Sequence, residues 1–376
     1  MKIVFFLGTF DFGGAEKHAL LLADYYKNQL NWETEVWGWS ELDGPIPSMC
    51  SDINVKTKDV PKWEYTNFFK RKILEFFYKK ALKNTDVVMS FNNKPNIFCA
   101  EFLKHTNVKL HVWAQQGIDG YTFPKVTQKN AIDKVRCVIS NSQNGADYLI
   151  SQVGVKPDII FVVHNGIDTK LYPRDPRKWN KELKLSVPDQ FNAVMVANIT
   201  RLKDHITLIK SWQIVVKTLL ERGVKANLYL AGRKDNMYKT SYNPVKENSL
   251  EDNVFFLGQV KDVYNLVELM DLTLLSSPSE GLPNAVLEAM LLAKPFVGTN
   301  IPGIREAVGN ENLQYLVEEK NEEDLAAKIL KFAFSKELSK EVGEKNKKWV
   351  ENNFPIEKLW KDTHEIVMRH LEKNGE

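Results

Sequence analysis

Hydrophobic and polar positions follow two recurring patterns along the chain, short apolar runs and longer amphipathic segments. The short runs are rich in β-branched and aromatic residues, as in strands, whereas the longer segments repeat their apolar positions with a helical period. Because the two patterns alternate, they predict parallel sheets covered by helices, an α/β fold class. The predicted strands are 3–7, 34–39, 87–91, 110–114, 137–140 and 159–163, followed by 193–196, 227–230, 254–257, 272–275 and 295–297.

The strands fall into two series, and each series has the pattern of a doubly wound sheet. The chain has 376 residues, more than one hydrophobic core usually serves. Between the series lies a polar stretch, 172–188, that is rich in Pro, Arg and Lys and has the turn chemistry of a linker. We therefore place a domain boundary near Asp168. Amphipathic segments 321–334 and 336–351 and a last segment ending near Glu372 predict helices at the C-terminal end.

Composition and charge narrow the range of functions. Hydrophobic residues make up 43% of the chain and charged residues 26%, which fits a folded globular protein. The formal net charge of +3 is spread evenly over both halves, so nucleic acid is a poor default partner. Cys50, Cys99 and Cys137 are widely spaced and suggest neither a disulfide framework nor a cysteine metal site. No apolar run has the length of a membrane span or a signal peptide, so we expect a cytoplasmic protein.

A glycine turn follows the first predicted strand. Gly13 and Gly14 lie between that strand and a helical run from Lys17. Glycines at such a turn let backbone N–H groups approach a phosphate, and the helix dipole adds positive potential. The segment has neither the G-x-G-x-x-G pattern nor the G-K-[ST] ending of a P-loop. Taken alone, it is equally compatible with an anion site and a plain turn.

The segment 276–290 is the most informative part of the chain. It follows the apolar strand 272–275, contains Gly281, and continues into a helix for which Pro283 suits the first position. Ligands of open α/β sheets bind at such strand carboxyl ends. Exposed N–H groups between Gly281 and Ala285 would favour an anion such as a diphosphate.

Two glutamates frame this turn. Glu288 lies in a helix whose other residues are nearly all apolar, so it either faces solvent or binds a partner such as a sugar or ribose diol. Glu280 precedes it by roughly 12 Å at helical rise, farther than the carboxylates of glycosidases, so the two would bind different parts of one long ligand. We favour this interpretation over the alternative, in which both glutamates are ordinary surface residues. Arg201 and Lys203, after strand 193–196, could reach the same diphosphate, although an ordinary basic helix entry fits them equally well.

On the basis of these residues, the chain resembles the family 4 glycosyltransferases of the GT-B fold. The resemblance covers nearly the whole chain in the expected order. Its strongest element is the E-x7-E pattern of Glu280 and Glu288. The other matching motifs are Gly13-Gly14-Ala15-Glu16, Asn165-Gly166-Ile167-Asp168, Lys203, Leu230-Ala231-Gly232 and Phe256-Leu257-Gly258.

The resemblance implies two Rossmann-like domains with parallel sheets facing across a cleft. Residues 1–168 would bind the acceptor and 169–352 the nucleotide-sugar donor, and the helix in 353–376 would cross back to the first domain. The implied enzyme is a hexosyltransferase that retains anomeric configuration and acts in polysaccharide or glycan biosynthesis. It would move a sugar from UDP, or as second choice GDP, to a hydroxyl of a saccharide or lipid-linked acceptor.

Roles follow residue by residue from the same resemblance. Glu288 should bind the donor ribose and Glu280 the transferred sugar, and Lys203 should contact the diphosphate. The implied catalytic set is Glu280, Lys203 and Arg201. The implied donor-binding set is Gly13, Gly14, Asn198, Arg201, Lys203, Gly232, Arg233, Gln259, Val260, Glu280, Gly281, Leu282, Pro283, Asn284 and Glu288, with the base near Arg233 and against the backbone of Gln259 and Val260.

Two positions depart from the family pattern. Many members have Arg where this chain has Asn198, and Arg201 is our candidate to replace it. Many also have His after the fourth strand of the first domain, where this chain reads Gln115, Gln116. His111 comes earlier and should lie within the strand. We therefore expect the acceptor side at Gln115 and Gln116.

A glycosyltransferase of this kind must chiefly stabilise the negative charge that develops on the leaving diphosphate. Lys203, Arg201 and the helix N-terminus at Pro283 could do this without a metal, and the chain contains no Asp-x-Asp element. We therefore predict no metal and no cofactor. Two other functions fit the same fold: a nucleotide-sugar epimerase, for which we find no set of acid and base groups, and a non-catalytic nucleotide-sugar-binding partner of another transferase.

Segment 62–80 interleaves aromatic residues with Lys and Arg. It could lie on an anionic membrane as a peripheral contact on the inner face of the cell membrane and deliver a lipid-linked acceptor. A core helix with a basic solvated face explains the same pattern equally well, because helical spacing would bury several of the aromatic side chains.

Overall fold

The computed structural model describes most of the chain as helices, strands and short connections. The described residues are 1–11, 13–39, 44–62, 68–118, 123–168, 177–183 and 189–373. Most of the predicted linker 172–188, residues 63–67 of segment 62–80, and Phe12 of the glycine turn lie outside the described residues.

The chain divides into two compact units. Unit 1 consists of Met1–Gly166 together with Ile356–Glu376, and unit 2 consists of Ile167–Pro355. The boundary expected near Asp168 falls beside this division. The chain passes between the units at two points that lie together in the fold, since Ile167 pairs with Pro355 in an isolated parallel bridge.

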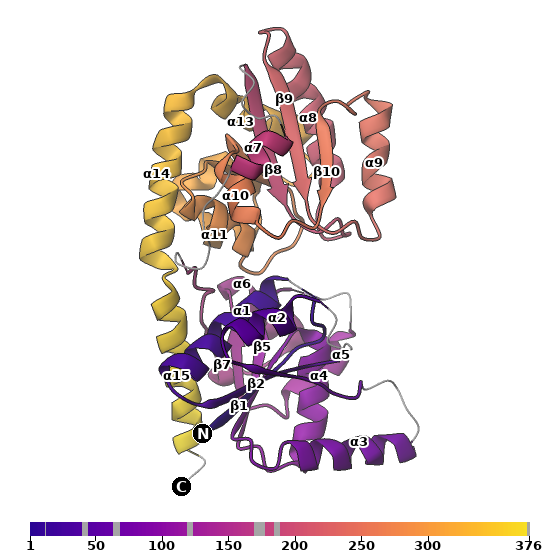
Figure 1. The fold of residues 1–376 in the computed structure, drawn as a ribbon, viewed down its shortest axis with the longest axis vertical. Helices are drawn as coiled ribbons and strands as arrows, with labels where there is room; N and C mark the ends of the chain where they lie inside the picture. Colours follow the sequence, from indigo (N-terminus) through magenta and orange to yellow (C-terminus); the bar gives the residue numbers. More distant parts are fainter. Residues whose placement is uncertain are drawn as a thin grey trace. The chain divides into compact units, whose positions relative to one another are not determined.

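Unit 1 is a seven-stranded parallel sheet covered by helices on both faces (Figure 1). The strand order is β3-β2-β1-β4-β5-β6-β7. Its strands are β1 Lys2–Phe6, β2 Glu33–Gly38, β3 Lys56–Asp59, β4 Val87–Phe91, β5 Leu110–Gln115, β6 Cys137–Ser140 and β7 Ile160–Val162. Its helices are α1 Gly14–Asp24, α2 Ile46–Asp52, α3 Phe68–Ala81, α4 Asn93–Phe102, α5 Lys125–Ile132, α6 Gln143–Tyr148 and α15 Ile356–Glu372.

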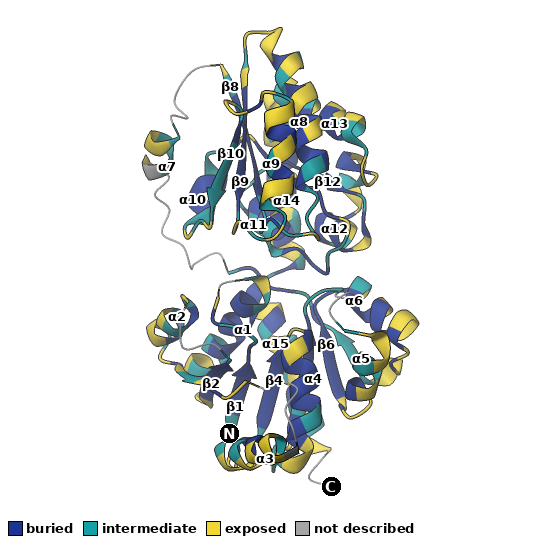
Figure 2. Ribbon diagram, turned by 90° about the vertical axis from the view of Figure 1, so that its right-hand side faces the viewer, coloured by how far each residue is buried: buried dark blue, intermediate teal, exposed yellow. Residues whose placement is uncertain are grey.

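Successive residues of β1 face opposite layers of helices, as the two-residue period of a strand requires. Ile3 and Phe5 pack with α1, α2 and α15, whereas Val4 and Phe6 pack with α3 and α4. Both faces of the central strands are therefore buried (Figure 2). This explains why the strands read as continuous apolar runs rather than as alternating ones.

Helix α15 belongs to unit 1 although it comes last in the chain. The Trp360 ring stacks on Tyr25 with ring centroids 5.3 Å apart, and the Trp360 indole N–H donates to the carbonyl of Leu21. Ile366 and Val367 complete the apolar layer over the sheet. The C-terminal helix thus returns to the first domain, as predicted. None of the helices in the described ranges combines the length and the apolar content that a membrane crossing requires.

Unit 2 repeats the architecture with a six-stranded parallel sheet in the order β10-β9-β8-β11-β12-β13. Its strands are β8 Gln190–Val196, β9 Lys225–Ala231, β10 Val254–Gly258, β11 Leu272–Leu275, β12 Phe296–Thr299 and β13 Leu316–Val317. Its helices are α7 Arg177–Glu182, α8 His205–Leu220, α9 Tyr238–Glu247, α10 Val263–Glu268, α11 Asn284–Leu291, α12 Pro302–Val308, α13 Glu322–Phe334 and α14 Lys336–Asn353.

Each sheet reverses its strand order at one place. In unit 1 this place lies between β1 and β4, and in unit 2 between β8 and β11. Connections leave these neighbouring strands in opposite directions, which opens a crevice at their carboxyl ends. The predicted glycine turn follows β1, and the predicted residues Lys203 and Glu280 follow β8 and β11. The fold therefore brings the candidate residues to the reversal points.

Candidate active site

Hydrogen bonds join the turn after β8 to the end of β11 in unit 2. The Asp204 N–H donates to the carbonyl of Ser276, and the Ser276 hydroxyl donates back to the Asp204 carbonyl at 2.7 Å. The Ser277 hydroxyl donates to the Leu202 carbonyl at 2.7 Å. These bonds hold together two segments that are far apart in the sequence and fix the backbone on both sides of Lys203.

Lys203 and Glu280 form an ion pair at this edge. The Lys203 ammonium contacts Glu280 Oε1, and the two side chains are 22% and 11% exposed. Partial burial limits solvent screening, so this pair interacts more strongly than an ion pair on the open surface. The structure thus brings together two residues predicted independently from different motifs.

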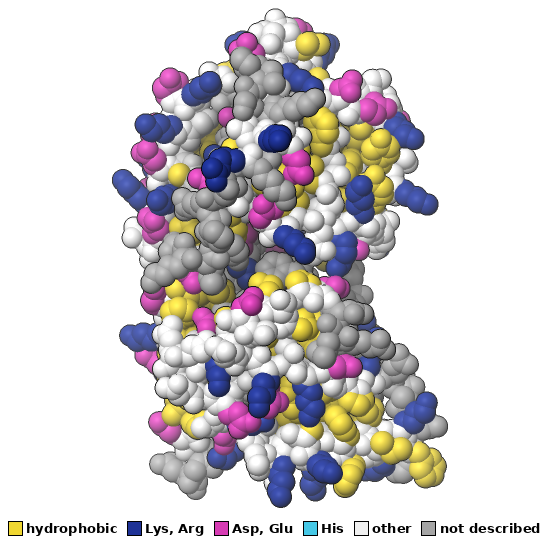
Figure 3. Space-filling view, in the orientation of Figure 1, with side chains coloured by type: hydrophobic (Ala, Val, Ile, Leu, Met, Phe, Trp, Pro, Cys, Tyr) yellow, Lys and Arg dark blue, Asp and Glu magenta, His cyan; other side chains and the backbone are white. Residues whose placement is uncertain are grey.

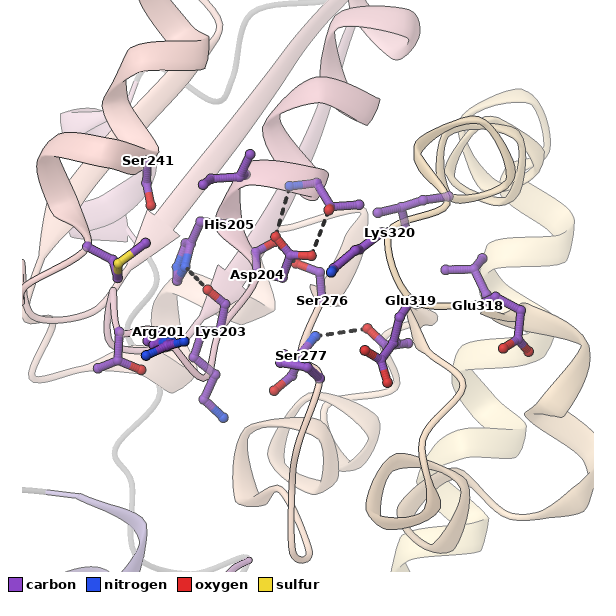
Figure 4. Close-up of a pocket in the computed structure, with 18 residues that line it drawn as sticks. Arg201, Lys203, Asp204, His205, Ser241, Ser276, Ser277, Glu318, Glu319 and Lys320 are labelled. Carbon is purple, nitrogen blue, oxygen red and sulfur yellow. Dashed lines mark hydrogen bonds between the residues drawn. The ribbon is translucent and has the colours of Figure 1, made fainter. Parts of the chain in front are cut away.

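The two helices that start at this edge differ at their N-termini. Asp204 caps α8, because its carboxylate accepts from the Thr207 N–H at 3.1 Å and from the Thr207 hydroxyl at 2.6 Å (Figure 4). Helix α11 has Pro283 at the N-cap, and this side chain makes no capping hydrogen bond. Pro283 therefore stands one position before the helix rather than at its first position. The N-terminal dipole of α11 has no negative cap of its own.

A glycine behind the Glu280 loop permits its position. A Cβ added to Gly303 in α12 would come within 1.9 Å of the Gly281 carbonyl oxygen and 2.5 Å of the Glu280 carbonyl oxygen. No other residue type allows so close an approach between a helix and a backbone loop. Gly303 was not predicted from the sequence, although its place after Pro302 at a helix start was visible.

The E-x7-E glutamates differ in their surroundings. Glu280 lies in the loop after β11, whereas Glu288 is on α11 between buried Leu287 and Ala289 and is itself half-buried. Gly281, Leu282 and Pro283 between them are buried, and Asn284 is half-buried. The segment therefore lies against the body of unit 2 and is not a freely exposed surface turn.

The turn after β8 is also tied to the turn after β9. The Arg233 N–H donates to Asn198 Oδ1 at 2.9 Å, and a Cβ on Gly232 would lie within 2.0 Å of the Ala197 carbonyl oxygen. The Asn198 side chain therefore links the turn after β8 to the turn after β9, and it has no positive charge. Arg201 is exposed.

The residues predicted to face the base lie on the next loops. The Arg233 guanidinium makes two hydrogen bonds to the Asp235 carboxylate, at 3.0 and 3.1 Å. Gln259 is exposed and Val260 is half-buried after β10. Their contact with a base stays a prediction.

A cavity of about 190 Å³ opens beside the turn after β8. It lies between the start of α8, the end of β11 and the segment 317–320, and Arg201 and Lys203 belong to its wall (Figure 4). Glu280, Glu288 and residues 281–284 do not line it. The cavity therefore adjoins the predicted donor residues without containing them, and we assign it no ligand.

The glycine turn of unit 1 carries a carboxylate. Gly13 is the N-cap of α1 and Gly14 its first residue. Glu16 is 6% exposed, and a Cβ on Gly13 would lie within 2.6 Å of Glu16 Oε2. Asn92, after β4, donates to Glu16 Oε1 at 3.3 Å. A negative group thus already lies beside this helix N-terminus, and the predicted contact of Gly13 and Gly14 with a diphosphate stays a prediction.

The two glutamines after β5 have different surroundings. Gln115 is buried, accepts from the Trp113 indole N–H at 2.9 Å and donates to the Gly117 carbonyl. Gln116 Oε1 lies 3.0 Å from Nδ1 of His18 on α1, and Asn141, after β6, donates to the Gln116 carbonyl at 3.3 Å. Gln116, rather than Gln115, therefore belongs to a polar cluster with His18 and Asn141 at the carboxyl edge.

Burial lowers the pKa of His18 to about 4, so its imidazole is neutral near pH 7. Its Nδ1 then donates to Gln116 Oε1, an assignment made from the hydrogen-bond network. His111 lies within β5, as predicted, where Nε2 is 2.8 Å from the Ser90 hydroxyl and burial lowers the pKa to about 3.

No three His, Cys, Asp or Glu side chains in the described part of the chain are grouped so that they could hold a metal ion. The three cysteines are buried and free, and burial raises the pKa of Cys50 and of Cys137 to about 12.

Two family models match the chain in sequence order. The model of glycosyltransferase family 4 matches residues 12–171, and the model of glycosyl transferases group 1 matches residues 177–349. The Bacillus anthracis N-acetyl-α-D-glucosaminyl L-malate synthase is 30% identical over 59% of this chain and 57% of its own length. The Staphylococcus aureus capsular polysaccharide biosynthesis glycosyltransferase CapM is 24% identical over 56% of this chain and 54% of its own. The match thus spans about half the length of these curated relatives.

Solved structures resemble the whole chain. The UDP-glucose complex of Anabaena Alr3699/HepE has a TM-score of 0.86 at 19% identity and covers 98% of this chain and 100% of that one. The S. aureus TarM G117R mutant has a TM-score of 0.76 at 14% identity and covers 97% and 99%. These likenesses establish the fold. Together with the two family matches, they show that this chain belongs to the family 4 glycosyltransferases of the GT-B fold.

Proposed function

We propose that this protein transfers a hexose-type sugar from a UDP-sugar to a hydroxyl of a saccharide or lipid-linked acceptor, with retention of configuration and without a metal ion. Unit 2 would bind the donor and unit 1 the acceptor. The ion pair between Lys203 and Glu280 carries the proposal. It places a cation and a hydrogen-bond acceptor together at the strand-order reversal of unit 2, where open α/β sheets bind ligands.

In the proposed reaction, the bond between the sugar C1 and the diphosphate oxygen breaks, and a bond between C1 and the acceptor oxygen forms. Negative charge grows on the leaving diphosphate, and Lys203 exchanges its contact with Glu280 for a contact with that charge. Arg201 and the N-terminus of α11 would add positive potential. The released Glu280 carboxylate can then accept hydroxyl groups of the sugar. A phosphate oxygen of the donor takes the acceptor proton on the same face.

The choice of UDP rests on known proteins of the same fold. Anabaena HepE has been solved with UDP-glucose, and S. aureus TarM with UDP. Glu288, half-buried on α11, is the proposed ligand of the donor ribose. Capsular polysaccharide biosynthesis is the activity named for the CapM relative, which supports a saccharide or lipid-linked acceptor.

The test is release of UDP from a panel of UDP-sugars by wild type, Glu280→Gln and Glu319→Gln. Glu319 lines the neighbouring cavity and is the matched control. We expect Glu280→Gln to lose about 10² in turnover while binding UDP at least as well as wild type, because Lys203 loses its internal partner. Turnover in chelator should be unchanged. Binding of nucleotide sugars without turnover on any acceptor would favour a non-catalytic partner instead.

A further inference from the structure

Helix α3 presents an apolar stripe to solvent. Phe69, Ile73 and Phe76 are 77%, 68% and 70% exposed, far more than large apolar side chains usually are. Their spacing of four and three residues places them on one face of the helix. Figure 3 shows hydrophobic side chains mixed with Lys and Arg in the region where Figure 1 draws α3.

The opposite face of α3 anchors the helix to unit 1. Leu74 and Tyr78 are buried in the apolar cluster that also contains Phe98. The Tyr78 hydroxyl donates to the Pro61 carbonyl at 2.8 Å, and its ring packs edge-on against Phe98 with centroids 4.9 Å apart. The stripe is therefore the outer face of a firmly packed helix. The core-helix interpretation accounts for Leu74, Phe77, Tyr78 and Ala81, but it leaves the exposed stripe unexplained.

Basic residues flank the stripe. Lys80 continues its line at the C-terminal end of α3, and Lys72 and Lys79 lie along one side, all three exposed. The only acidic residue of α3 is Glu75, which pairs with Lys72 at 2.8 Å and with Arg71 at 3.3 Å. Apart from this carboxylate, the helix offers positive charge beside its apolar stripe.

We infer that α3 lies on an anionic lipid bilayer, with Phe69, Ile73 and Phe76 inserted at the boundary of head groups and acyl chains. An apolar face flanked by lysines is the combination that binds such a surface, because insertion buries apolar area while lysines contact anionic head groups. Exposed hydrophobic stripes also bind proteins, but the excess of lysine selects a partner with dense negative charge.

The position of α3 separates this contact from catalysis. Figures 1 and 2 both draw α3 at the end of unit 1 from which β1 starts, away from the strand carboxyl ends. The contact would therefore tether the protein to the bilayer without forming part of the site where Gln116 and His18 lie. Substitutions on the stripe should leave turnover of water-soluble donors unchanged.

The experiment is flotation of the full chain with phosphatidylcholine vesicles that contain about 30% phosphatidylglycerol, at about 50 mM salt. The wild type should float with these vesicles and about tenfold less with phosphatidylcholine alone. The triple variant Phe69→Ser, Ile73→Ser, Phe76→Ser should lose binding about tenfold or more. The matched control is Val126→Ser, which changes an exposed apolar residue of α5 in the same unit.

A second variant tests the charges. We expect a loss of flotation for the triple variant Lys72→Glu, Lys79→Glu, Lys80→Glu. The control is a triple variant of unit 2 with the same net charge, in which exposed lysines are changed as Lys217→Glu, Lys225→Glu, Lys239→Glu. This control should float like wild type. Thermal unfolding and UDP release check that each variant is folded. Wild type that stays unbound at low salt, or a stripe variant that floats normally, overturns the inference. Self-association that disappears in the stripe variant without lipid would assign the stripe to a protein contact and overturn it as well.

Discussion

The two units carry different kinds of side chain at the points where their strand orders reverse. In unit 2, a lysine and a glutamate pair directly between β8 and β11, and the N-terminus of α11 lacks a side-chain cap. In unit 1, the carboxyl edge carries the amides of Gln116 and Asn141 and a histidine that burial keeps neutral. Two sheets with the same construction therefore present a charged edge and a largely neutral one.

This difference matches what two substrates of a glycosyl transfer require. A nucleoside diphosphate brings negative charge, which a cation and a helix dipole stabilise. A sugar hydroxyl is neutral and is recognised by donors and acceptors in fixed directions, which amides and a neutral imidazole provide. Glu16 is the charged exception at the edge of unit 1, and its carboxylate beside the α1 N-terminus disfavours a phosphate there. The comparison thus argues for donor binding by unit 2 and acceptor binding by unit 1.

The largest expected effect comes from removing the cation of unit 2. Lys203→Ala should lower kcat/KM for UDP release by about 10² to 10³, the usual cost of losing one group that stabilises developing charge. Steady-state release of UDP measures it. Lys210→Ala is the control, since Lys210 is an exposed lysine within α8, the helix that follows Lys203, and pairs with Glu322 at 3.0 Å. Equal activity of the two variants would show that Lys203 does not stabilise the charge on the leaving diphosphate.

The neutral state of His18 in unit 1 should make the free energy of unfolding depend on pH. The His18 pKa is about 4 in the folded protein against 6.5 for an ordinary imidazole. Between these values the unfolded chain binds a proton that the native chain does not, so stability falls as pH decreases. From about pH 7 to about pH 5, the wild type should lose ~2 kcal/mol more of its unfolding free energy than His18→Gln.

Urea unfolding at both pH values measures this difference. His111 titrates in both proteins and cancels. If His18→Gln and wild type respond equally to acid, the pKa of His18 is not lowered in the folded protein, and burial does not keep this imidazole neutral between about pH 5 and about pH 6.5.

A smaller effect is expected where α12 supports the Glu280 loop. Gly303→Ala places a methyl group where the Gly281 carbonyl now lies, so the loop must shift and the contact between Glu280 and Lys203 must change. We expect about tenfold weaker UDP-sugar binding by calorimetry. Gly117→Ala is the control, because a Cβ there meets no atom within 4 Å. Unchanged binding by Gly303→Ala would show that the loop position is not required.

The sequence predicts most of the fold because its central strands are buried on both faces. Strands β4, β6 and β11 coincide with the predicted ranges. Strand β3 was missed, since Lys56–Asp59 contains no apolar residue and pairs only with β2 at the sheet edge. Strand β8 begins earlier than predicted, because buried Asn192 accepts a hydrogen bond from Asn227 of β9, a pairing that no apolar pattern reports.

The candidate site was predictable as a set of motifs but not as a set of contacts. Lys203 and Glu280 each stand out in the sequence, but their pairing follows only from the adjacency of β8 and β11. The hydrogen bonds that the Ser276 and Ser277 hydroxyls donate to backbone carbonyls gave no sequence signal. Gln115 and Gln116 could not be told apart without side-chain directions, since one ends the strand beside Trp113 and the other lies beyond it.

The smallest effect concerns the amide of Gln116. His18 and Asn141 both lie against its Oε1, which leaves the Nε2 group buried and without a hydrogen bond in the described part of the chain. A buried N–H group of this kind is costly unless something accepts from it, and an acceptor hydroxyl can do so. Gln116→Leu should therefore lower transfer to simple glycosides about three- to tenfold relative to release of free sugar, while UDP release changes little. The ratio of glycoside to free sugar formed from a labelled UDP-sugar measures this. A parallel fall in both products would mean that Gln116 supports the fold of unit 1 and makes no contact with the acceptor.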